Sequence, residues 1–598
     1  MNMANNKSLA ILSMLTLINF TLCFILDSYS LLVFTLCVLT ALVGIGLNIL
    51  MGMSGQISFG HIAFYAIGAY LSALLLMNGA PFVIAMLMSA LICCLIGGLL
   101  AIPAMRVSGP YLAMITIAFA FVVHHGLIEW RSLTGGGNGL MGIPMPMFAD
   151  MDPSQLLAVI STIALSLSLL VYAFLYNSGW GKAMRAVKAS PIATRSLGFN
   201  PVQTKTLAFA LSAFFAGLAG SIIPSLMLFI SPSTFPFSQS ILFVLVVIIG
   251  GASTLWGPVL GAVIVVLLPE VLSPLAEYRL LIFAVLLLIV LWGAPRGILG
   301  ELEAKFTRYK KEFPPKSVNK EFINNFYDRA INGLTSLKVD KIGIQFGGVK
   351  AAQNVTFEAE LGQVTSIIGP NGAGKTTVLN MISGFYKPNQ GSIELNEQLA
   401  GKNAYQIARC GIARTYQTSQ LFDDMSVLEN LLTAMQQGRL GHPFISNKTE
   451  QKELALNLLS LVGFKGGIHT PTQNLAHVDR RIVEIARALA TRPWVLLLDE
   501  PVAGLSRQDT DKLSALLKTI ANFGIAVILV EHDMQLVMDV SDKILVLDAG
   551  KPIAMGEPSD IRQDSKVIVA YLGGQVTKQA LAKKLGKQKE KLFYLLRI

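Results

Sequence analysis

A glycine-rich segment that ends in one lysine and two threonines lies at residues 369–377. It follows the short apolar run 364–368 and precedes an apolar helical pattern that begins at Val378, so the expected order is strand, loop and helix. Glycines lack a Cβ atom, which lets the backbone turn its N–H groups toward phosphate oxygens, and a helix N-terminus adds positive potential. The segment therefore predicts a site for a nucleoside triphosphate, formed by Gly369, Pro370, Asn371, Gly372, Ala373, Gly374, Lys375, Thr376 and Thr377.

Oxygen ligands that suit a hard cation occur at the loop and after two further apolar stretches. Asp499 ends the apolar run 495–498, and Gln417 follows a strand-like stretch. Carboxylate and hydroxyl oxygens are the ligands that Mg²⁺ prefers. We therefore expect Thr376, Gln417 and Asp499 to hold Mg²⁺ beside bound ATP.

The same strand ends carry groups that can act on a phosphate. Glu500 follows Asp499 and is expected to orient or deprotonate the attacking water, which Gln417 also contacts. His532 follows the apolar run 525–530 and can donate to the γ-phosphate. Phe346, upstream of the loop, is expected to stack on adenine. The predicted catalytic residues are Glu500, His532 and Gln417.

The polarity of the chain is divided unevenly. Of 598 residues, 53% are hydrophobic and 14% charged, with a mean hydropathy of +0.59, which is unusual for a soluble protein. Residues 1–300 contain ten basic and six acidic residues, whereas the remainder contains 37 and 30. We predict a membrane domain followed by a soluble one. The net charge of +11 does not indicate nucleic acid, because no basic patch is interleaved with aromatic residues.

Apolar runs predict about ten membrane spans, at 9–26, 30–51, 62–78, 82–104, 110–129, 154–177, 204–230, 239–252, 256–272 and 278–293, of which 239–252 is short. If the N-terminus lies inside, eight basic residues fall on the inner side: Lys7, Arg106, Lys182, Arg185, Lys188, Arg195, Lys205 and Arg296. The six acidic residues of this half then fall outside, with Arg131 and Arg279. This bias fits the positive-inside rule and places the soluble half in the cytoplasm, where ATP is.

Two breaks between predicted spans contain no charged residue, at 52–61 and 250–258. Irregular backbone at membrane depth is tolerated where it lines a cavity or is buried in protein, so both breaks are candidate walls of a pathway. Tight turns between packed helices are the alternative.

The loop 178–205 carries five basic residues and no acidic one. Its middle, 182–195, has helix formers at amphipathic spacing and predicts a short helix on the inner face, on which a cytoplasmic motor could push. The alternative is a positively charged topological anchor.

The order of the soluble motifs resembles the ATPase domain of ABC transporters, and shorter stretches resemble the ATPase of branched-chain amino acid importers. These stretches are 346–349, 413–417, 484–489 and 570–573. Residues 1–300 are similar to the matching permease at 46–50, 54–61, 109–112, 133–139, 250–253, 256–261 and 295–297. The resemblance implies a complex with a second permease subunit, a second ABC ATPase subunit and an external substrate-binding protein.

One motif departs from that family. The LSGGQ-like signature aligns with Leu475, Ala476, His477, Val478 and Asp479. Ala476 lacks the serine hydroxyl, and the Cβ of Val478 crowds a backbone that should approach the partner's γ-phosphate. We therefore expect an intact phosphate loop in this chain and an impaired contribution to the partner's ATP site.

The sequence thus predicts a multidomain chain with a polytopic α-helical membrane domain of about ten spans and an α/β P-loop ABC ATPase domain with a helical subdomain. The expected boundaries are 1–300 for the permease, 301–335 for a linker, 336–573 for the ATPase and 574–598 for a basic tail that lies on anionic lipid or is solvated. We expect a bacterial inner-membrane importer of branched-chain or related apolar amino acids. Import of urea, short amides or aromatic acids and a half-size exporter are the alternatives.

Overall fold

The computed structural model describes residues 6–104, 110–148, 150–272, 277–306, 312–315, 317–328, 335–441 and 448–572. The predicted tail 574–598, together with Arg106 and Gly109, lies outside these residues. The chain forms two compact units. The first contains Met1–Lys188, Pro201–Arg308 and Gly441–Ser446, and the second contains Ala189–Asn200, Tyr309–Leu440 and Asn447–Ile598.

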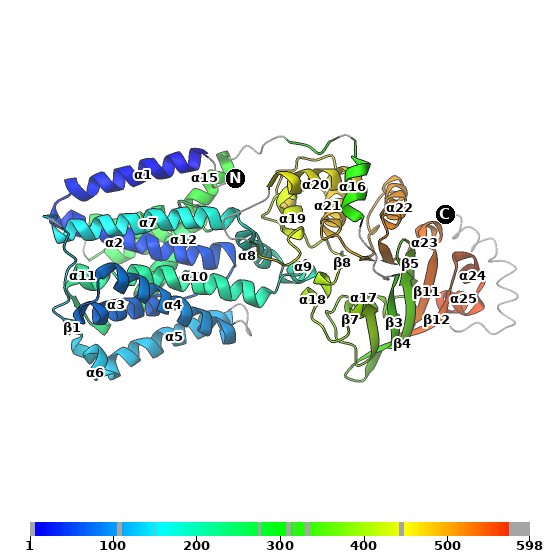
Figure 1. The fold of residues 1–598 in the computed structure, drawn as a ribbon, viewed down its shortest axis with the longest axis horizontal. Coiled ribbons are helices and arrows are strands. Elements are labelled where there is room, and N and C mark those ends of the chain that lie inside the picture. The colour runs from blue at the N-terminus through cyan, green and yellow to red at the C-terminus, as the bar shows by residue number, and fades with distance from the viewer. Residues whose placement is uncertain are drawn as a thin grey trace. The chain divides into compact units, whose positions relative to one another are not determined.

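The first unit is a bundle of apolar helices (Figure 1). Its main helices are α1 (Asn6–Ile25), α2 (Ser28–Leu47), α3 (His61–Met77), α4 (Phe82–Ala104), α5 (Pro110–Glu129), α7 (Pro153–Asn177), α10 (Pro201–Gly220), α12 (Phe237–Gly250), α13 (Gly257–Val271) and α14 (Arg279–Gly293). Among the described residues, six helical segments are long and apolar enough to cross a membrane, and four shorter apolar helices accompany them. Each predicted span overlaps one of these ten segments, so the expected count of about ten is roughly consistent with the structure, which has six clear candidate spans among the described residues.

Helix α10 lies at the centre of the bundle, where it packs on α2, α3 and α4. Many side chains of α4 face outward and are apolar, including Leu91, Leu95 and Leu99. An apolar outer surface suits lipid, in which apolar side chains carry no penalty. The first unit is therefore built as a membrane-embedded bundle.

The basic loop forms two helices, so the expectation of one short helix over 182–195 was wrong. Helix α8 (Gly179–Ala189) ends before Ser190, and α9 (Pro191–Ser196) begins at the next residue. Pro191 has no N–H to continue α8, and it pushes Ser190 to an extended conformation (φ −154°, ψ 102°). The Ser190 side chain then accepts a hydrogen bond from Ala193 N and caps α9.

The second unit contains two sheets. In its described part, six strands follow the order β12-β11-β5-β10-β9-β8: β5 (Val364–Ile368), β8 (Ile412–Arg414), β9 (Val495–Asp499), β10 (Ala526–Val530), β11 (Lys543–Asp548) and β12 (Lys551–Gly556). All neighbours are parallel except β11 and β12. Strands β5, β9 and β10 are buried along their whole length, which explains their uninterrupted apolar sequences.

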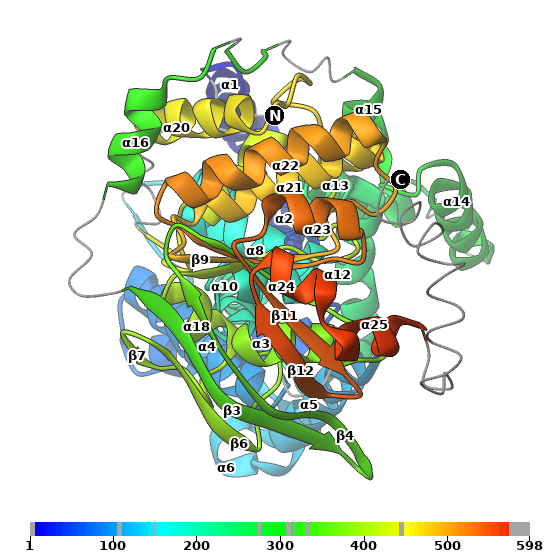
Figure 2. The same cartoon turned by 90° about the vertical axis from the view of Figure 1, so that its right-hand side faces the viewer.

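A second, antiparallel sheet has the order β4-β3-β6-β7 in the described residues. Its strands are β3 (Ser336–Phe346), β4 (Val349–Glu360), β6 (Gln390–Leu395) and β7 (Glu397–Gln398), and Figure 2 shows β3 and β4 side by side. The helices of this unit include α17 (Lys375–Ile382), α18 (Ala404–Arg409), α19 (Val427–Ala434), α20 (Lys448–Leu461), α21 (His477–Ala490), α22 (Arg507–Asn522) and α23 (Met534–Val540).

The segment expected to be only a linker, 301–335, contains regular structure. Helix α15 (Ile298–Phe306) enters it, and α16 (Lys320–Tyr327) lies within it. The Tyr327 hydroxyl donates to Leu489 O at 2.8 Å, and its ring stacks on Phe523 with 5.3 Å between centroids. The end of this segment is therefore packed on the second unit.

Candidate functional site

The glycine-rich loop 369–374 joins β5 to α17 and makes two backbone approaches that exclude a side chain. A Cβ atom on Gly369 (φ +151°) would lie 2.1 Å from Leu547 O, and one on Gly374 (φ +95°) would lie 2.4 Å from Ala351 O. Only glycine fits at these two positions. The loop ends at Lys375, where α17 begins and its unpaired N–H groups point toward the loop.

Lys375 is buried under this loop. Its Nζ donates to Gly369 O at 2.7 Å and to Pro370 O at 3.2 Å. Burial lowers the pKa of Lys375, although Glu500 and Asp499 nearby oppose the shift. Phosphate oxygens would give this ammonium stronger partners than two carbonyl groups. Thr376, the next residue, is exposed, so its hydroxyl is accessible to an ion on the loop.

Three neighbouring strands end at this loop. Val530 of β10 lies opposite Ile367 of β5 and Asp499 of β9. The residues that follow these strands therefore meet at one edge of the sheet, which is where open α/β sheets bind ligands.

The three predicted catalytic side chains come together at this edge. Gln417 Nε2 donates to Glu500 Oε2 at 2.7 Å, and His532 Nδ1 lies 3.9 Å from the same oxygen. Glu500 has a left-handed backbone (φ +48°), and its N–H donates to Val530 O at 2.8 Å. A non-glycine residue in this conformation is strained, and such strain often marks a functional position.

Asp499 is paired with Arg414, a residue for which the sequence patterns predicted no role. Arg414 Nη2 lies 3.1 Å from Asp499 Oδ2, and the two side chains are only 3% and 5% exposed. Burial raises the pKa of Asp499, and the Arg414 guanidinium opposes that shift. In the part of the chain that the structure describes, no group of three or more His, Cys, Asp or Glu could hold a metal ion. Thr376 and Asp499 carry the hydroxyl and carboxylate oxygens that Mg²⁺ prefers, so these two residues are the ones that would hold Mg²⁺ beside a bound nucleotide.

The predicted adenine platform, Phe346, is 46% exposed. Its ring makes an edge contact with Tyr386, with 5.1 Å between centroids and an interplanar angle of 69°. Tyr386 follows α17 and was not predicted from the sequence. Together the two rings offer an exposed aromatic surface on the same unit as the phosphate loop.

The altered signature residues surround the first turn of α21. Ala476 is the N-cap of this helix and makes no side-chain capping hydrogen bond, as expected for a residue without a hydroxyl. Ala476 and His477 are exposed, whereas Leu475, Val478 and Asp479 are half-buried. Burial raises the pKa of Asp479. The valine side chain is thus present where the family pattern has a bare backbone.

Charged residues further along α21 hold the backbone of the site, a role that the sequence patterns did not predict for them. Arg481 donates to three carbonyl oxygens, those of Tyr416, Gln417 and Glu500. The distances to Gln417 O and Glu500 O are 2.9 and 2.8 Å. Arg481 therefore fixes the backbone of two of the three predicted catalytic residues, Gln417 and Glu500. The available signal was a charged residue at a buried position of an amphipathic helix.

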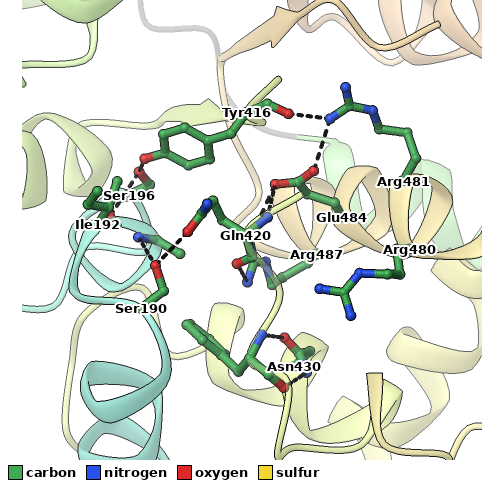
Figure 3. A network of polar contacts seen from close by, with 12 residues as sticks. Ser190, Ile192, Ser196, Tyr416, Gln420, Asn430, Arg480, Arg481, Glu484 and Arg487 are labelled. Atoms are coloured by element: carbon green, nitrogen blue, oxygen red, sulfur yellow. Dashed lines mark hydrogen bonds and ion pairs between the residues drawn. The ribbon is translucent and has the colours of Figure 1, made fainter. Parts of the chain in front are cut away.

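Glu484, one turn later, holds the same loop (Figure 3). It is fully buried, accepts a hydrogen bond from Gln420 N at 3.1 Å and pairs with Arg481 at 3.2 Å and Arg487 at 3.8 Å. Burial raises the pKa of Glu484, against the opposing effect of the two arginines. A buried charge with this many partners is costly to leave unpaired, so the loop 416–420 is held in one place.

Helix α9 belongs to the same unit and contacts this loop from the other side, as Figure 3 shows. Ser190 Oγ donates to Gln420 Oε1 at 2.9 Å, and the hydroxyls of Ser196 and Tyr416 are hydrogen-bonded. Arg409 of α18 donates to Gly198 O at 2.8 Å. Residues 189–200 of the basic loop therefore contact the residues next to Gln417 within this unit.

Glu531 is a further residue that the sequence did not single out. It is fully buried and accepts hydrogen bonds from Val502 N at 2.9 Å and His532 N at 3.1 Å. Burial raises its pKa. This carboxyl group ties the turn after Glu500 to the strand end that carries His532.

Comparisons with known proteins agree with the division of the chain into a membrane unit and an ATPase unit. A family model described as the permease component of branched-chain amino acid transport systems matches residues 29–291, and a model described as ABC transporter matches residues 352–503.

Relatives match both parts of the chain. The chain is 43% identical over 248 residues to the high-affinity branched-chain amino acid transport ATP-binding protein LivG of Salmonella typhimurium, which covers 40% of this chain and 97% of that protein. It is 42% identical over 249 residues to BraF of Pseudomonas aeruginosa, with coverages of 40% and 97%. It is 32% identical over 291 residues to the permease protein LivM of Salmonella typhimurium, with coverages of 44% and 68%.

An apolar helical bundle followed by an ATP-binding cassette defines an integral membrane protein of the ABC transporter class, with an ATP-hydrolysing domain. Both regions have relatives in a single kind of transport system. The chain belongs to the branched-chain amino acid ABC transporter family, with the permease and the ATP-binding component joined in one polypeptide.

Proposed function

We propose that this chain is the fused permease–ATPase subunit of an importer that carries branched-chain or related apolar amino acids across the bacterial inner membrane. The observation that carries the proposal is the match of both regions to relatives named for branched-chain amino acid transport, joined to a phosphate loop and strand ends with all the expected polar residues. The domain boundaries 1–300, 301–335 and 336–573 are part of the proposal.

The orientation follows from the charges of the permease half. Eight of its ten basic residues fall on the side of the N-terminus when ten spans alternate, which favours an inner N-terminus and a cytoplasmic ATPase. ATP sites of this class need two ATPase domains, so we propose a second permease subunit, a second ATPase subunit and an external substrate-binding protein as partners.

The roles of the site residues follow from their placement. Lys375 and the loop N–H groups would bind the phosphates, and the exposed Thr376 would ligate Mg²⁺ with Asp499 and Gln417 nearby. When bound there, Mg²⁺ would supply positive charge that offsets the charge of the phosphates. Glu500, held by Gln417 and Arg481, would orient or deprotonate water, and His532 would donate to the γ-phosphate.

Transport direction and solute can be tested in one assay. The chain is reconstituted in vesicles with its partner subunits, and labelled leucine is added on the side of the external binding protein. We expect accumulation only when ATP and the binding protein are both present, with competition by valine and isoleucine. Competition by urea, short amides or aromatic acids instead of valine would change the solute, and efflux without a binding protein would contradict import.

A further inference from the structure

The two uncharged breaks of the permease are joined directly to each other. At the end of α2 the chain continues as a π-helical turn, η1 (Asn48–Met53), and the other break is the turn between α12 and α13. Asn48 Oδ1 accepts a hydrogen bond from Ser253 N at 2.7 Å, and its Nδ2 donates to Thr254 O at 2.8 Å. Ser253 Oγ donates to Gly52 O at 2.6 Å. Three hydrogen bonds thus connect segments about two hundred residues apart in sequence.

This junction leaves no room for adjustment. A Cβ atom on Gly52 would lie 2.3 Å from Asn48 Oδ1 and 2.7 Å from Ser253 N. Asn48 is fully buried, and its Nδ2 also lies 3.0 Å from the Tyr172 hydroxyl on α7. Removing one partner leaves a buried polar group unpaired, which costs free energy of folding. The two breaks are therefore expected to move together rather than separately.

A lysine of the basic loop contacts this junction. Lys188, on the last turn of α8, donates from Nζ to Gly52 O at 2.9 Å, the same oxygen that accepts from Ser253. This carbonyl lies at the C-terminal end of η1, where a cation is favoured by the helix dipole. The lysine stem lies over Gly55, where a Cβ atom would be 2.9 Å from Lys188 Cγ.

Lys188 lies next to a segment that contacts the ATPase unit. Two residues later, Ser190 caps α9, which is bound to the loop beside Gln417 in the ATPase unit. We propose that Lys188 is a positioning residue that passes displacement of the α8–α9 segment to the joined breaks, so that both breaks move as one body during transport. This inference rests on the proposed transport function. It holds whether the two breaks line a transport pathway or are only tight turns between packed helices.

The test compares Lys188→Met with Lys188→Arg in the assembled transporter with its binding protein. Lys188 is exposed, so its replacement opens no cavity. Uptake of labelled leucine and ATP hydrolysis are measured in the same vesicles. We expect Lys188→Met to lower the leucine transported per ATP by about tenfold, a factor within the range that the loss of one charge-assisted hydrogen bond gives, while ATP hydrolysis continues. Lys188→Arg should keep most of the coupling.

A matched control is Lys305→Met, which removes an exposed positive charge on α15. Lys305→Met should leave the amount of leucine transported per ATP unchanged. The inference would be overturned if Lys188→Met transported as much leucine per ATP as the wild type, or if both methionine variants lost this coupling equally.

Failure of the proposed function itself would be visible in the wild-type chain, which would then not accumulate leucine. In that case Lys188 is tested by maleimide labelling of an Ala252→Cys variant, because residue 252 is exposed in the second break. The labelling is corrected for that of the native cysteines. ATP should change the labelling rate when Lys188 is present and should not change it in the Lys188→Met background. Equal ATP responses in the two backgrounds would overturn the inference.

Discussion

Glu500 depends on residues that surround its backbone as much as on its own carboxylate. Its left-handed conformation is held by a hydrogen bond to Val530 O and by the guanidinium of Arg481, which also holds Gln417 O. The strain of such a conformation, about 1–3 kcal/mol, persists only where neighbours determine it. Sequence patterns predicted Glu500 because it follows a buried strand and an aspartate. They gave no sign that Arg481, a turn into a distant helix, fixes it.

The altered signature leads to a prediction at the scale of single residues. If the Val478 side chain keeps the helix N-terminus from the partner's γ-phosphate, the ATP site that uses this signature is slow. In a Glu500→Gln background, where this chain's own site is silent, Val478→Gly should raise the residual ATPase rate by about 10²-fold, the lower end of what one preorganised donor contributes. ATPase assays of the assembled transporter measure this rate.

The matching control places Val478→Gly in a complex whose partner ATPase carries glutamine at the equivalent catalytic glutamate. There the substitution should change little, because the site that uses this signature is already silent. If Val478→Gly has no effect in the Glu500→Gln background either, the valine is tolerated and the two ATP sites do not differ through it.

At the scale of elements, the buried parallel strands were predictable and the antiparallel sheet was not. The apolar runs 364–368, 495–498 and 525–530 match β5, β9 and β10 to within a residue, because strands buried on both faces read as continuous apolar runs. Strand β3 is different. Its register shifts on the way from Asp340 to Gly343, and Lys341 has a positive φ of 46°, so the regular alternation that signals a half-buried strand is lost.

The basic loop shows the same limit. Its charge and amphipathic spacing predicted a helix on the inner face, but the position of the break depends on one proline, and the partner of α9 is set by tertiary contacts of hydroxyl groups. Sequence periodicity carries no information about such contacts.

Those contacts give a prediction for α9 as an element. Replacing residues 191–196 with glycine and serine of equal length removes the helix and the Ser196–Tyr416 hydrogen bond. We expect ATP hydrolysis to persist within about threefold, because the phosphate loop and strand ends are untouched, while leucine uptake falls by tenfold or more. Phosphate release measures ATP hydrolysis, and labelled leucine measures uptake in the same vesicles.

The control for α9 is Ile192→Ala, which trims a side chain that is 49% exposed on the same helix. It should retain uptake. Normal uptake by the glycine–serine chain would show that the loop is only a topological anchor.

At the scale of the whole molecule, the chain combines the two activities that a transporter of this class requires. One unit supplies apolar helices whose two breaks are joined by Asn48, Gly52 and Ser253, and the other supplies a phosphate loop with Gln417, Glu500 and His532 at neighbouring strand ends. The chain order was readable from composition alone, since charge and hydropathy change abruptly near residue 300. The hydrogen bonds within each unit could not be predicted from composition, because they join residues far apart in sequence.

The most direct test of the account is ATP-driven leucine uptake by the assembled transporter with and without Glu500→Gln. The variant keeps the phosphate loop, so nucleotide binding should be close to that of the wild type. Its ATP hydrolysis and its leucine accumulation should fall together, by about 10²- to 10⁴-fold if the carboxylate acts on water. Leucine accumulation at the wild-type rate in Glu500→Gln, with its ATP binding intact, would contradict the claim that this chain's own site drives transport.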